Sequence, residues 1–398
     1  MSNKTILVAF GGASPEHEVS VLTAMQSIAA LRERNHTIIP LYIGKTGRWY
    51  TGTNLTNLEE YKDLKALIAS SSPCTFAHNE NGRVVLMETA SKGIFSKPKS
   101  FQFDVVLPSF HGSDGENGAF QGVCETFNIP YAGSGVLGSA VGMDKLTAKS
   151  LCRSANFPVV DDVGFYESEW VANKASIIET ISALGYPVFV KPVSLGSSIG
   201  VTRASDQNSL INAVESAFRY DRHILVEKGV SPLKEINCSV MGTPENATAS
   251  VLEHPMGSEE LLSFKDKYQR GEGAKGMASA DRIIPAELPS EKTEEIRTLA
   301  VQIFKNMNCS GLARLDFLLN AETNEVFFNE INTIPGSFSF YLWDHSDISF
   351  PQLLEQLISI ALEQHQQKNG RVRSYETNLL SQKAAVGLKG LKGTKGPR

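Results

Sequence analysis

The chain has 398 residues, of which 41% are hydrophobic and 20% are charged, and its formal net charge at pH 7 is −5. This length predicts two or three domains, and the composition is typical of a folded globular protein. The negative net charge argues against a general nucleic-acid or membrane-surface binder, and no apolar run approaches membrane-spanning length. The five cysteines are scattered and lack CxxC spacing, which indicates reduced thiols and no cysteine metal motif.

The N-terminal region predicts a β-loop-α-β unit. The apolar segment 5–10 is expected to be a buried strand, and its apolar run is too brief for a signal peptide. The periodicity of 19–34 predicts a helix, and 37–43 predicts the next strand. Ligands of such units lie at the carboxyl ends of the strands. Glu16 lies there and can meet the ammonium group of a ligand, although the local sequence fits a solvated loop glutamate equally well.

The segment 44–99 is polar and irregular, and we interpret it as an elaboration of the same domain. After it, 104–110 predicts a buried strand that ends in a Gly-rich loop beginning at His111. A lone loop histidine is usually structural, but this position favours contact with a ligand. The segment 133–138 fits GxGxxG, yet no acidic residue follows about twenty residues later, which disfavours a dinucleotide site. We interpret it as the crossing into a second domain, ahead of a helix that bears Lys145.

A third set of strands carries groups suited to a nucleotide. The strand predicted over 186–192 contains Lys191 and leads into the small-residue loop 194–200. Backbone N–H groups and hydroxyls of such a loop can surround phosphates while the lysine offsets their charge. A surface hairpin with a Gly/Ser turn is the alternative, but an apolar strand seldom holds an unpaired ammonium group. The next strand, 223–229, ends where backbone groups can meet a base, and Glu235 is a candidate for the ribose hydroxyls.

The C-terminal half contains one further loop and two helices of interest. The segment 263–280 is polar and Gly-rich, which is typical of a mobile lid that closes over a nucleotide. Helices are predicted over 289–308 and 349–366. The segment 379–398 has five basic residues and no acidic ones, which predicts a disordered tail.

Two short apolar segments, 311–320 and 326–336, predict a β-hairpin with polar residues set into it. Residues two apart project from the same face of a strand. If the two strands pair, the side-chain oxygens of Asp316, Glu330 and Asn332 can therefore converge. Oxygen ligands of this kind suit Mg²⁺ and a bound phosphate.

The alternative is a hairpin whose polar residues simply face solvent. Two features argue against it. Aspartate, asparagine and Arg314 interrupt strands that are otherwise apolar, and a buried charge is costly unless a metal or a partner compensates it. The second strand also ends in the turn 335–336, which leaves a backbone N–H available to an anion.

Eight sequence strings occur in the order typical of one family. They are GG.S.EHEVS, FHG..GENG, GSGVLGSA.GMDK, VKP…GSSIGV, VEK, FKDKY, ARLDF and NEINTIPG, and the likeness extends from Thr5 to about Ala361. The chain resembles the D-alanine–D-alanine ligases, which are ATP-grasp enzymes. The resemblance implies an α/β (α+β) protein with a three-domain ATP-grasp fold and a Rossmann-like N-terminal domain. The implied divisions are an N-terminal substrate-binding α/β domain at 1–133, a central ATP-grasp subdomain at 134–228, a C-terminal ATP-grasp subdomain with the metal and catalytic residues at 229–370, and a disordered basic tail at 371–398.

The resemblance also implies roles for individual residues. ATP is expected to contact Lys145, Lys191, Ser197, Ser198, Glu227, Lys228, Val230, Glu235 and the lid residue Lys267. Two Mg²⁺ ions, with Mn²⁺ as a possible replacement, are expected on Asp316, Glu330 and Asn332. The catalytic set is expected to comprise Glu16, Ser197, Tyr268, Arg314 and Gly336. The amino-acid substrates are expected to contact Glu16, His111, Ser339 and Tyr341.

The implied reaction forms D-alanyl-D-alanine for peptidoglycan synthesis in the cytoplasm. A carboxylate oxygen of D-alanine attacks the γ-phosphoryl group of ATP, and the amine of a second D-alanine then displaces phosphate from the resulting D-alanyl phosphate. Within this resemblance Glu16 binds the first ammonium group, while Arg314 and the N–H of Gly336 stabilise the oxyanion. The expected partners are these small molecules, with no nucleic acid or membrane, and the expected assembly is a homodimer.

One departure from the family pattern leaves the acceptor open. The family usually has a serine five residues after the glycine of NEINTIPG, and here Tyr341 stands at that place with Ser339 as the nearest serine. D-serine, D-lactate and other amino acids are therefore alternative acceptors, although a lid tyrosine such as Tyr268 accompanies peptide formation in the family. A nucleotide-binding regulator without turnover is an alternative of another class. The oxyanion residue Arg314 argues against it, because a sensor does not need one.

Overall fold

The computed structural model describes residues 3–90, 98–256 and 282–374. Residues 1–362 group into one compact unit, and the described residues 363–374 belong to a second. The predicted lid and the end of the predicted tail, from 375 onward, lie outside the described residues. Among the helices in the described ranges, none is long and apolar enough to span a membrane.

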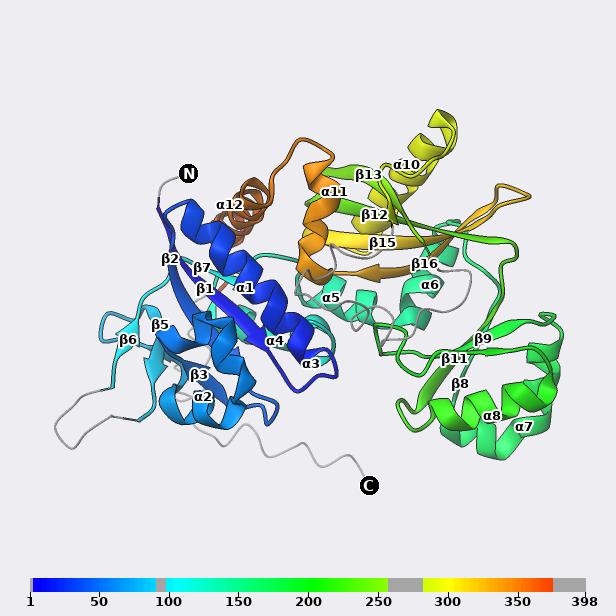
Figure 1. Cartoon of the computed structure of the whole chain (residues 1–398), viewed down its shortest axis with the longest axis horizontal. Coiled ribbons are helices and arrows are strands. Elements are labelled where there is room, and N and C mark those ends of the chain that lie inside the picture. Colours follow the sequence, from blue (N-terminus) through cyan, green and yellow to red (C-terminus); the bar gives the residue numbers. More distant parts are fainter. Residues whose placement is uncertain (1–2, 91–97, 257–281, 375–398) are drawn as a thin grey trace, which may run out of the picture. The chain divides into compact units, whose positions relative to one another are not determined.

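The first sheet has seven strands in the order β6-β5-β4-β3-β2-β1-β7 (Figure 1). β1 pairs in parallel with β2 and β7, and α1 follows β1, so the predicted β-loop-α-β unit is confirmed. The elements of this part are β1 (Thr5–Gly11), α1 (His17–Glu33), β2 (Thr37–Ile43), β3 (Trp49–Thr51), α2 (Leu64–Ser70), β4 (Ser72–His78), β5 (Val84–Glu88), β6 (Ser100–Phe101) and β7 (Val105–Pro108), with 3-10 turns at Thr53–Thr56 and Leu58–Lys62.

The prediction that 44–99 is irregular was wrong. This segment supplies β3, β4 and β5, which extend the sheet in antiparallel pairs. In β4 the buried positions alternate with exposed or half-buried ones, so about half of its residues are free to be polar. The segment was predicted to be irregular because strands that are short and half exposed resemble a loop in their amino-acid composition.

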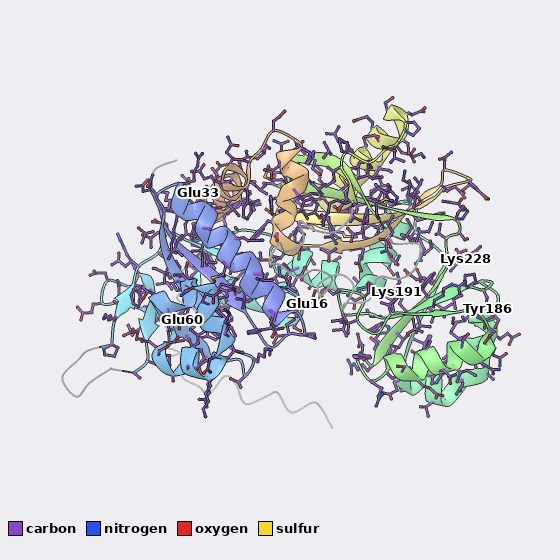
Figure 2. The ribbon with its side chains drawn as sticks, in the orientation of Figure 1. Glu16, Glu33, Glu60, Tyr186, Lys191 and Lys228 are labelled. Atoms are coloured by element: carbon purple, nitrogen blue, oxygen red, sulfur yellow. The ribbon has the colours of Figure 1, made fainter. Side chains whose placement is uncertain are left out.

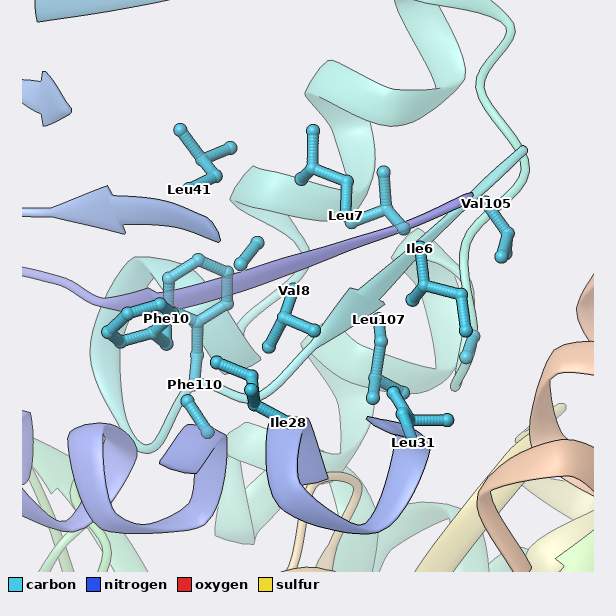
Figure 3. Close-up of a cluster of buried hydrophobic side chains, with 14 of the residues drawn as sticks. Ile6, Leu7, Val8, Phe10, Ile28, Leu31, Leu41, Val105, Leu107 and Phe110 are labelled. Carbon is cyan, nitrogen blue, oxygen red and sulfur yellow. The ribbon is translucent and has the colours of Figure 1, made fainter. Parts of the chain in front are cut away.

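One layer of the core of the first sheet lies between β1 and α1. β1 is flanked by parallel strands and buried on both faces, which explains its continuous apolar run. Figure 3 shows Val8 and Leu107 facing Ile28 and Leu31 of α1, and all four side chains are buried. This packing fixes the carboxyl end of β1, after which the chain continues to Glu16.

The second sheet is antiparallel, in the order β10-β9-β11-β8, and α7 and α8 pack on it (Figure 1). The strands predicted over 186–192 and 223–229 are confirmed as β9 and β11. The elements are β8 (Asp162–Tyr166), α7 (Glu167–Ser182), β9 (Val188–Pro192), β10 (Thr202–Ala204), α8 (Gln207–Ala217) and β11 (His223–Lys228).

The third sheet is also antiparallel, in the order β14-β13-β12-β15-β16. α10 packs its apolar side against β12 and β13. The elements are β12 (Leu233–Gly242), β13 (Ala247–Pro255), β14 (Arg282–Ile283), α10 (Ser290–Asn306), β15 (Gly311–Asn320) and β16 (Val326–Asn332).

Helices connect the sheets and close the fold. They are α3 (Ser113–Glu116), α4 (Ala119–Phe127), α5 (Val136–Met143), α6 (Lys145–Ser154), a 3-10 turn at Gly336–Ser339, α11 (Phe340–Asp344) and α12 (Phe350–Asn369). The domain divisions at 133/134 and 228/229 fall between strands of different sheets, and they stay a prediction. All five cysteines are buried free thiols.

Candidate active site

The hairpin of β15 and β16 brings four predicted residues together. Asp316 lies opposite Glu330, and Arg314 lies opposite Asn332, in the register of the two strands. The guanidinium of Arg314 donates two hydrogen bonds of 2.7 Å to the two carboxylate oxygens of Asp316. The amide nitrogen of Asn332 donates to the same carboxylate at 3.3 Å. The predicted hairpin is therefore confirmed, and its polar side chains converge on one face.

The pairing with Asp316 keeps the guanidinium of Arg314 charged and fixes its direction. Burial would lower the pKa of Arg314, but the adjacent carboxylate of Asp316 more than offsets this effect and raises the pKa. Two parallel N–H···O bonds also restrict the guanidinium plane. Arg314 is thus a cation that is already oriented before any ligand arrives.

A β-bulge interrupts this hairpin beside the cluster. The pairing shifts between Asp316 and Phe317, which lie opposite Glu330 and Phe328, so Asn329 is the extra residue on β16. The ammonium group of Lys191, on β9, donates to the side-chain oxygen of Asn329 at 3.0 Å. Through this contact between Asn329 and Lys191, the bulge connects the hairpin with the second sheet.

Lys145 links the loop 194–200 with the hairpin. It is the first residue of α6, whose N-terminus is capped by the carboxylate of Asp144. Its Nζ donates to the carbonyl oxygen of Leu195 at 2.6 Å and lies 3.3 Å from Oε2 of Glu330. One of the predicted phosphate lysines is thus beside the expected metal residues.

Glu16 meets the same loop from the other side. It precedes α1, and the hydroxyl of Ser197 donates to its carboxylate. Figure 2 shows Glu16 at the start of α1, and Lys191 and Lys228 on neighbouring strands of the second sheet. At Gly112, with φ of 67°, a Cβ atom would lie 2.5 Å from Oε2 of Glu16, so only glycine leaves room for this carboxylate.

Two buried titratable residues line the space beside Glu16. Burial lowers the pKa of His111 to about 4, so its imidazole is neutral near pH 7, and its Nε2 lies 2.8 Å from the hydroxyl of Thr23. Burial, followed by the charge of Glu16, raises the pKa of Glu116 to about 7. Sequence reasoning missed Glu116, although it is the glutamate of the GENG string.

The side chain of Glu227, predicted to lie at the adenine, is buried in a charge cluster. One carboxylate oxygen lies 2.6 Å from Nζ of Lys149, and the other pairs with Lys191. Burial alone would raise the pKa of Glu227, but the two ammonium groups outweigh it and lower the pKa to about 2. The carboxylate is thus engaged within the protein, and the backbone of this segment is what can meet a base. Lys149 was missed by the sequence reasoning.

A second cluster lies at the predicted acceptor end. The hydroxyl of Tyr341 donates to Glu253 at 3.1 Å, and Nη1 of Arg282 lies 3.0 Å from the other oxygen of that carboxylate. The guanidinium of Arg282 lies 4.1 Å from the centre of the Tyr341 ring. Asn237 also donates to Glu253, at 3.2 Å. Ser339 is 0% exposed, and its hydroxyl forms no hydrogen bond within the described part of the chain. Its contact with a substrate stays a prediction.

One cavity of about 180 Å³ joins most of these groups. The predicted residues that line it are Glu16, His111, Lys145, Ser197, Glu235, Arg314, Asp316, Glu330, Asn332, Gly336 and Tyr341. The predicted residues found outside its described lining are Lys191, Ser198, Glu227, Lys228, Val230 and Ser339. Lys267 and Tyr268 lie outside the described residues.

Comparison with known proteins assigns the family. The model described as "D-ala D-ala ligase N-terminus" matches residues 5–134, and the model described as "D-ala D-ala ligase C-terminus" matches residues 151–359. The chain belongs to the D-alanine–D-alanine ligase family.

Similar proteins span nearly the whole of this ligase-family chain. A D-alanine–D-alanine ligase of Thermosipho melanesiensis is 36% identical over 94% of this chain and 97% of its own length. One of Thermoanaerobacter sp. is 38% identical over 92% of this chain and 99% of its own length.

Among solved structures, the D-alanine–D-alanine ligase of Coxiella burnetii matches with a TM-score of 0.78 and 29% identity, over 93% of this chain and 97% of its own. The VanG D-Ala:D-Ser ligase of Enterococcus faecalis matches with a TM-score of 0.73 and 31% identity, over 90% and 100%. These findings confirm the predicted family, the ATP-grasp fold and the enzyme class, an ATP-dependent ligase. The roles of individual residues stay predictions.

Proposed function

We propose that this ligase joins two D-alanine molecules, with conversion of ATP to ADP and phosphate, to give D-alanyl-D-alanine for the cell wall. The observation that carries the proposal is that one cavity holds an oriented arginine, two carboxylates from a hairpin, and Lys145. The names of the similar proteins support the same reaction.

ATP would bind between the second and third sheets of the 1–362 unit. Lys145 and Lys191 would offset the phosphate charge, and the loop of Ser197 and Ser198 would present N–H groups and hydroxyls to it. The φ angles of these serines, 53° and 57°, lie in the left-handed region and turn the loop sharply. The backbone of Glu227, Lys228 and Val230 would line the adenine, with Glu235 at the ribose and Lys267 on the lid.

The hairpin residues fit Mg²⁺ in their chemistry. Asp316, Glu330 and Asn332 offer hard oxygen donors that face one cavity. The described residues contain no group of three or more His, Cys, Asp or Glu side chains arranged around a metal site, so substrate phosphates and water would have to complete the shell. When bound, Mg²⁺ (or Mn²⁺) supplies positive charge that offsets the charge of the transferring phosphoryl group.

The chain's own residues would position and stabilise the reacting groups. Glu16, held by Ser197, would bind the ammonium group of the first D-alanine and so aim its carboxylate at ATP. Arg314, already oriented by Asp316, and the N–H of Gly336 would stabilise the oxyanion that forms when the second amine attacks. Groups fixed in advance need little reorganisation during the reaction, which is where electrostatic catalysis is most effective.

A different acceptor is the second candidate. A D-Ala:D-Ser ligase is among the similar structures, and the Tyr341–Glu253–Arg282 cluster occupies the end of the cavity where a serine is usual in the family. D-serine, D-lactate or another amino acid would then replace the second D-alanine. The lid residue Tyr268 favours an amine over the hydroxyl of D-lactate.

One assay separates these candidates. The enzyme is given ATP, Mg²⁺ and D-alanine, alone or with D-serine, D-lactate or L-amino acids, while phosphate release is followed and products are identified by mass. We expect D-alanyl-D-alanine, ADP and phosphate, and no turnover with EDTA. AMP as the product, or turnover that resists EDTA, contradicts the proposal. The homodimer and the cytoplasmic location also stay proposals, and light scattering of the purified protein tests the former.

A further inference from the structure

Lys149 is a buried lysine to which no role has yet been given. Its side chain is 1% exposed, and lysine is almost never buried to this degree unless it is paired. Its Nζ lies 2.6 Å from Oε1 of Glu227 and donates to the carbonyl oxygen of Phe328 at 3.3 Å. It thus touches both the second sheet and the bulged strand of the hairpin.

The cluster around Lys149 has more positive than negative groups. Lys149 and Lys191 share the single carboxylate of Glu227, which the two cations keep ionised. Burial lowers the pKa of Lys149 and the charge of Glu227 opposes this effect, while the distance of 2.6 Å between Nζ and Oε1 is that of an ion pair. Two ammonium groups and one carboxylate then leave a net charge of about +1 in a region largely shielded from water, where charges act over longer distances than in solvent. Lys191 is the most exposed member of the three, at 13%.

The helix α6 connects this cluster with the remainder of the nucleotide site. Lys145 and Lys149 are one turn apart and therefore lie on the same face of α6. Lys145 contacts the loop 194–200 and Glu330, while Lys149 contacts Glu227 and the carbonyl of Phe328. Lys191 donates to Asn329, the neighbouring residue on the bulge. Both phosphate lysines are thus held in one network through α6.

We propose that Lys149 is a positioning residue of the nucleotide site: by sharing Glu227 it prevents this carboxylate from cancelling the charge of Lys191. The inference rests on the proposed function, in which Lys191 faces the phosphates of ATP. Without Lys149, Glu227 and Lys191 form a neutral pair, and the site loses about one positive charge toward a polyanion. The consequence concerns ATP affinity and leaves the D-alanine contacts unchanged.

The first test is Lys149→Met, which removes the charge and keeps a similar volume. Loss of one partner from a buried charge network is expected to weaken MgATP binding by about tenfold or more. The dissociation constant is measured by calorimetry, and the KM values for ATP and D-alanine by phosphate release. We expect the KM for ATP to rise in parallel with the dissociation constant, whereas the KM for D-alanine stays within about twofold of wild type.

A second variant distinguishes charge balance from mere packing. Lys149→Met combined with Glu227→Gln removes one charge of each sign and restores the net charge of the cluster through Lys191 alone. We expect the double variant to bind MgATP within about threefold of wild type, and therefore more tightly than Lys149→Met. If Lys149 only fills space, the second change instead adds to the first. The double variant leaves no buried carboxylate in the cluster, so it also serves if the single variant does not fold.

Two controls complete the design. Lys174→Met removes a lysine that pairs with Glu215 on the exposed side of the same domain, and it should leave MgATP binding unchanged. Lys149→Arg keeps the charge and should retain most of the affinity. Unchanged MgATP affinity in Lys149→Met, or a double variant as weak as the single one, overturns the proposal. Failure of the proposed function gives a different result: the wild-type protein itself shows no ATP-dependent ligation, irrespective of any variant.

Discussion

The carboxyl group of Glu116 is buried in the folded protein, and burial disfavours its ionised form. Burial and then the nearby charge of Glu16 raise its pKa from 4.5 to about 7, although the N–H groups of Gly112 and Ile334 donate to it. The unfolded chain releases this proton near 4.5 and the folded chain only near 7, so rising pH favours the unfolded state in this window. As pH rises from 4.5 to about 7, the carboxyl group of Glu116 alone is expected to lower the free energy of unfolding by up to roughly 3 kcal/mol.

Glu116→Gln is the variant that isolates this effect, because glutamine keeps the shape and a carbonyl acceptor but does not titrate. Urea unfolding of both proteins at about pH 5, 6 and 7 gives the difference in free energy at each pH. We expect the variant to gain stability relative to wild type as pH rises. Parallel curves for the two proteins would mean that Glu116 ionises at its ordinary pKa.

Tyr341 lines the cavity at the proposed acceptor end, where Arg282 contacts its ring and Glu253 accepts a hydrogen bond from its hydroxyl. Tyr341→Ser removes the ring from the cavity wall and should admit larger acceptors. When two substrates differ by one methylene group, an apolar pocket can distinguish them by roughly ten- to a hundredfold in kcat/KM. We therefore expect the ratio of D-alanyl-D-valine to D-alanyl-D-alanine to rise at least about tenfold.

Mass spectrometry of products from equal D-alanine and D-valine measures this ratio. Tyr341→Phe is the control, because it keeps the ring over Arg282 and removes only the bond to Glu253. An unchanged product ratio in Tyr341→Ser would place the acceptor elsewhere in the cavity.

At the scale of elements, the β15–β16 hairpin is where the proposed chemistry concentrates, and its Glu330 forms an ion pair with Lys145. Glu330→Gln removes one charge and almost no volume. We expect turnover to fall by about a hundredfold or more while the melting temperature stays close to that of wild type. Affinity for Mn²⁺, followed by electron paramagnetic resonance in the presence of ADP, should fall as well. Glu325→Gln in the exposed turn of the same hairpin is the matched control, and a Glu330 variant with normal turnover would show that the metal lies elsewhere.

The same hairpin shows how far sequence reasoning reaches. The two strands could be predicted from the sequence, and so could the shared face of Arg314 and Asp316, because the direction of side chains alternates from one residue to the next along a strand. The bulge at Asn329 could not, because one extra residue becomes visible only against the partner strand. The Glu253–Tyr341 contact was missed for a related reason: the two residues are far apart in the chain, and a single charge near the end of a strand has no local signature. Lys149 was overlooked beside Lys145, although a spacing of four residues on a helix predicts a shared face.

At the scale of the whole 1–362 unit, the three sheets differ in how they are joined. Side chains of the third-sheet region, among them Leu312, Ile334 and Trp343, belong to the same apolar cluster as the first sheet, and so do residues of α12. The described apolar cluster of the second sheet is built from residues 163–226 and is separate. Its contacts with the rest of the unit include polar ones beside the proposed nucleotide site, such as Ser197–Glu16, Lys149–Glu227 and Lys191–Asn329.

This difference predicts that the second sheet opens more readily than the third. Polar and charged contacts stabilise less than a shared apolar core, because the cost of removing buried charges from water offsets much of their attraction. The lowest-energy partial unfolding should therefore separate residues 162–228 from the rest. A nucleotide bound across the same contacts favours the closed form and should suppress the opening.

Hydrogen exchange followed by mass spectrometry tests this: amides of β9 and β11 should exchange faster than those of β12 and β15 in the free protein. They should slow by at least about tenfold with saturating MgATP, while β12 changes little. D-alanine without nucleotide is the control, and equal exchange in both sheets of the free protein would show that the polar contacts hold the second sheet as firmly as an apolar core.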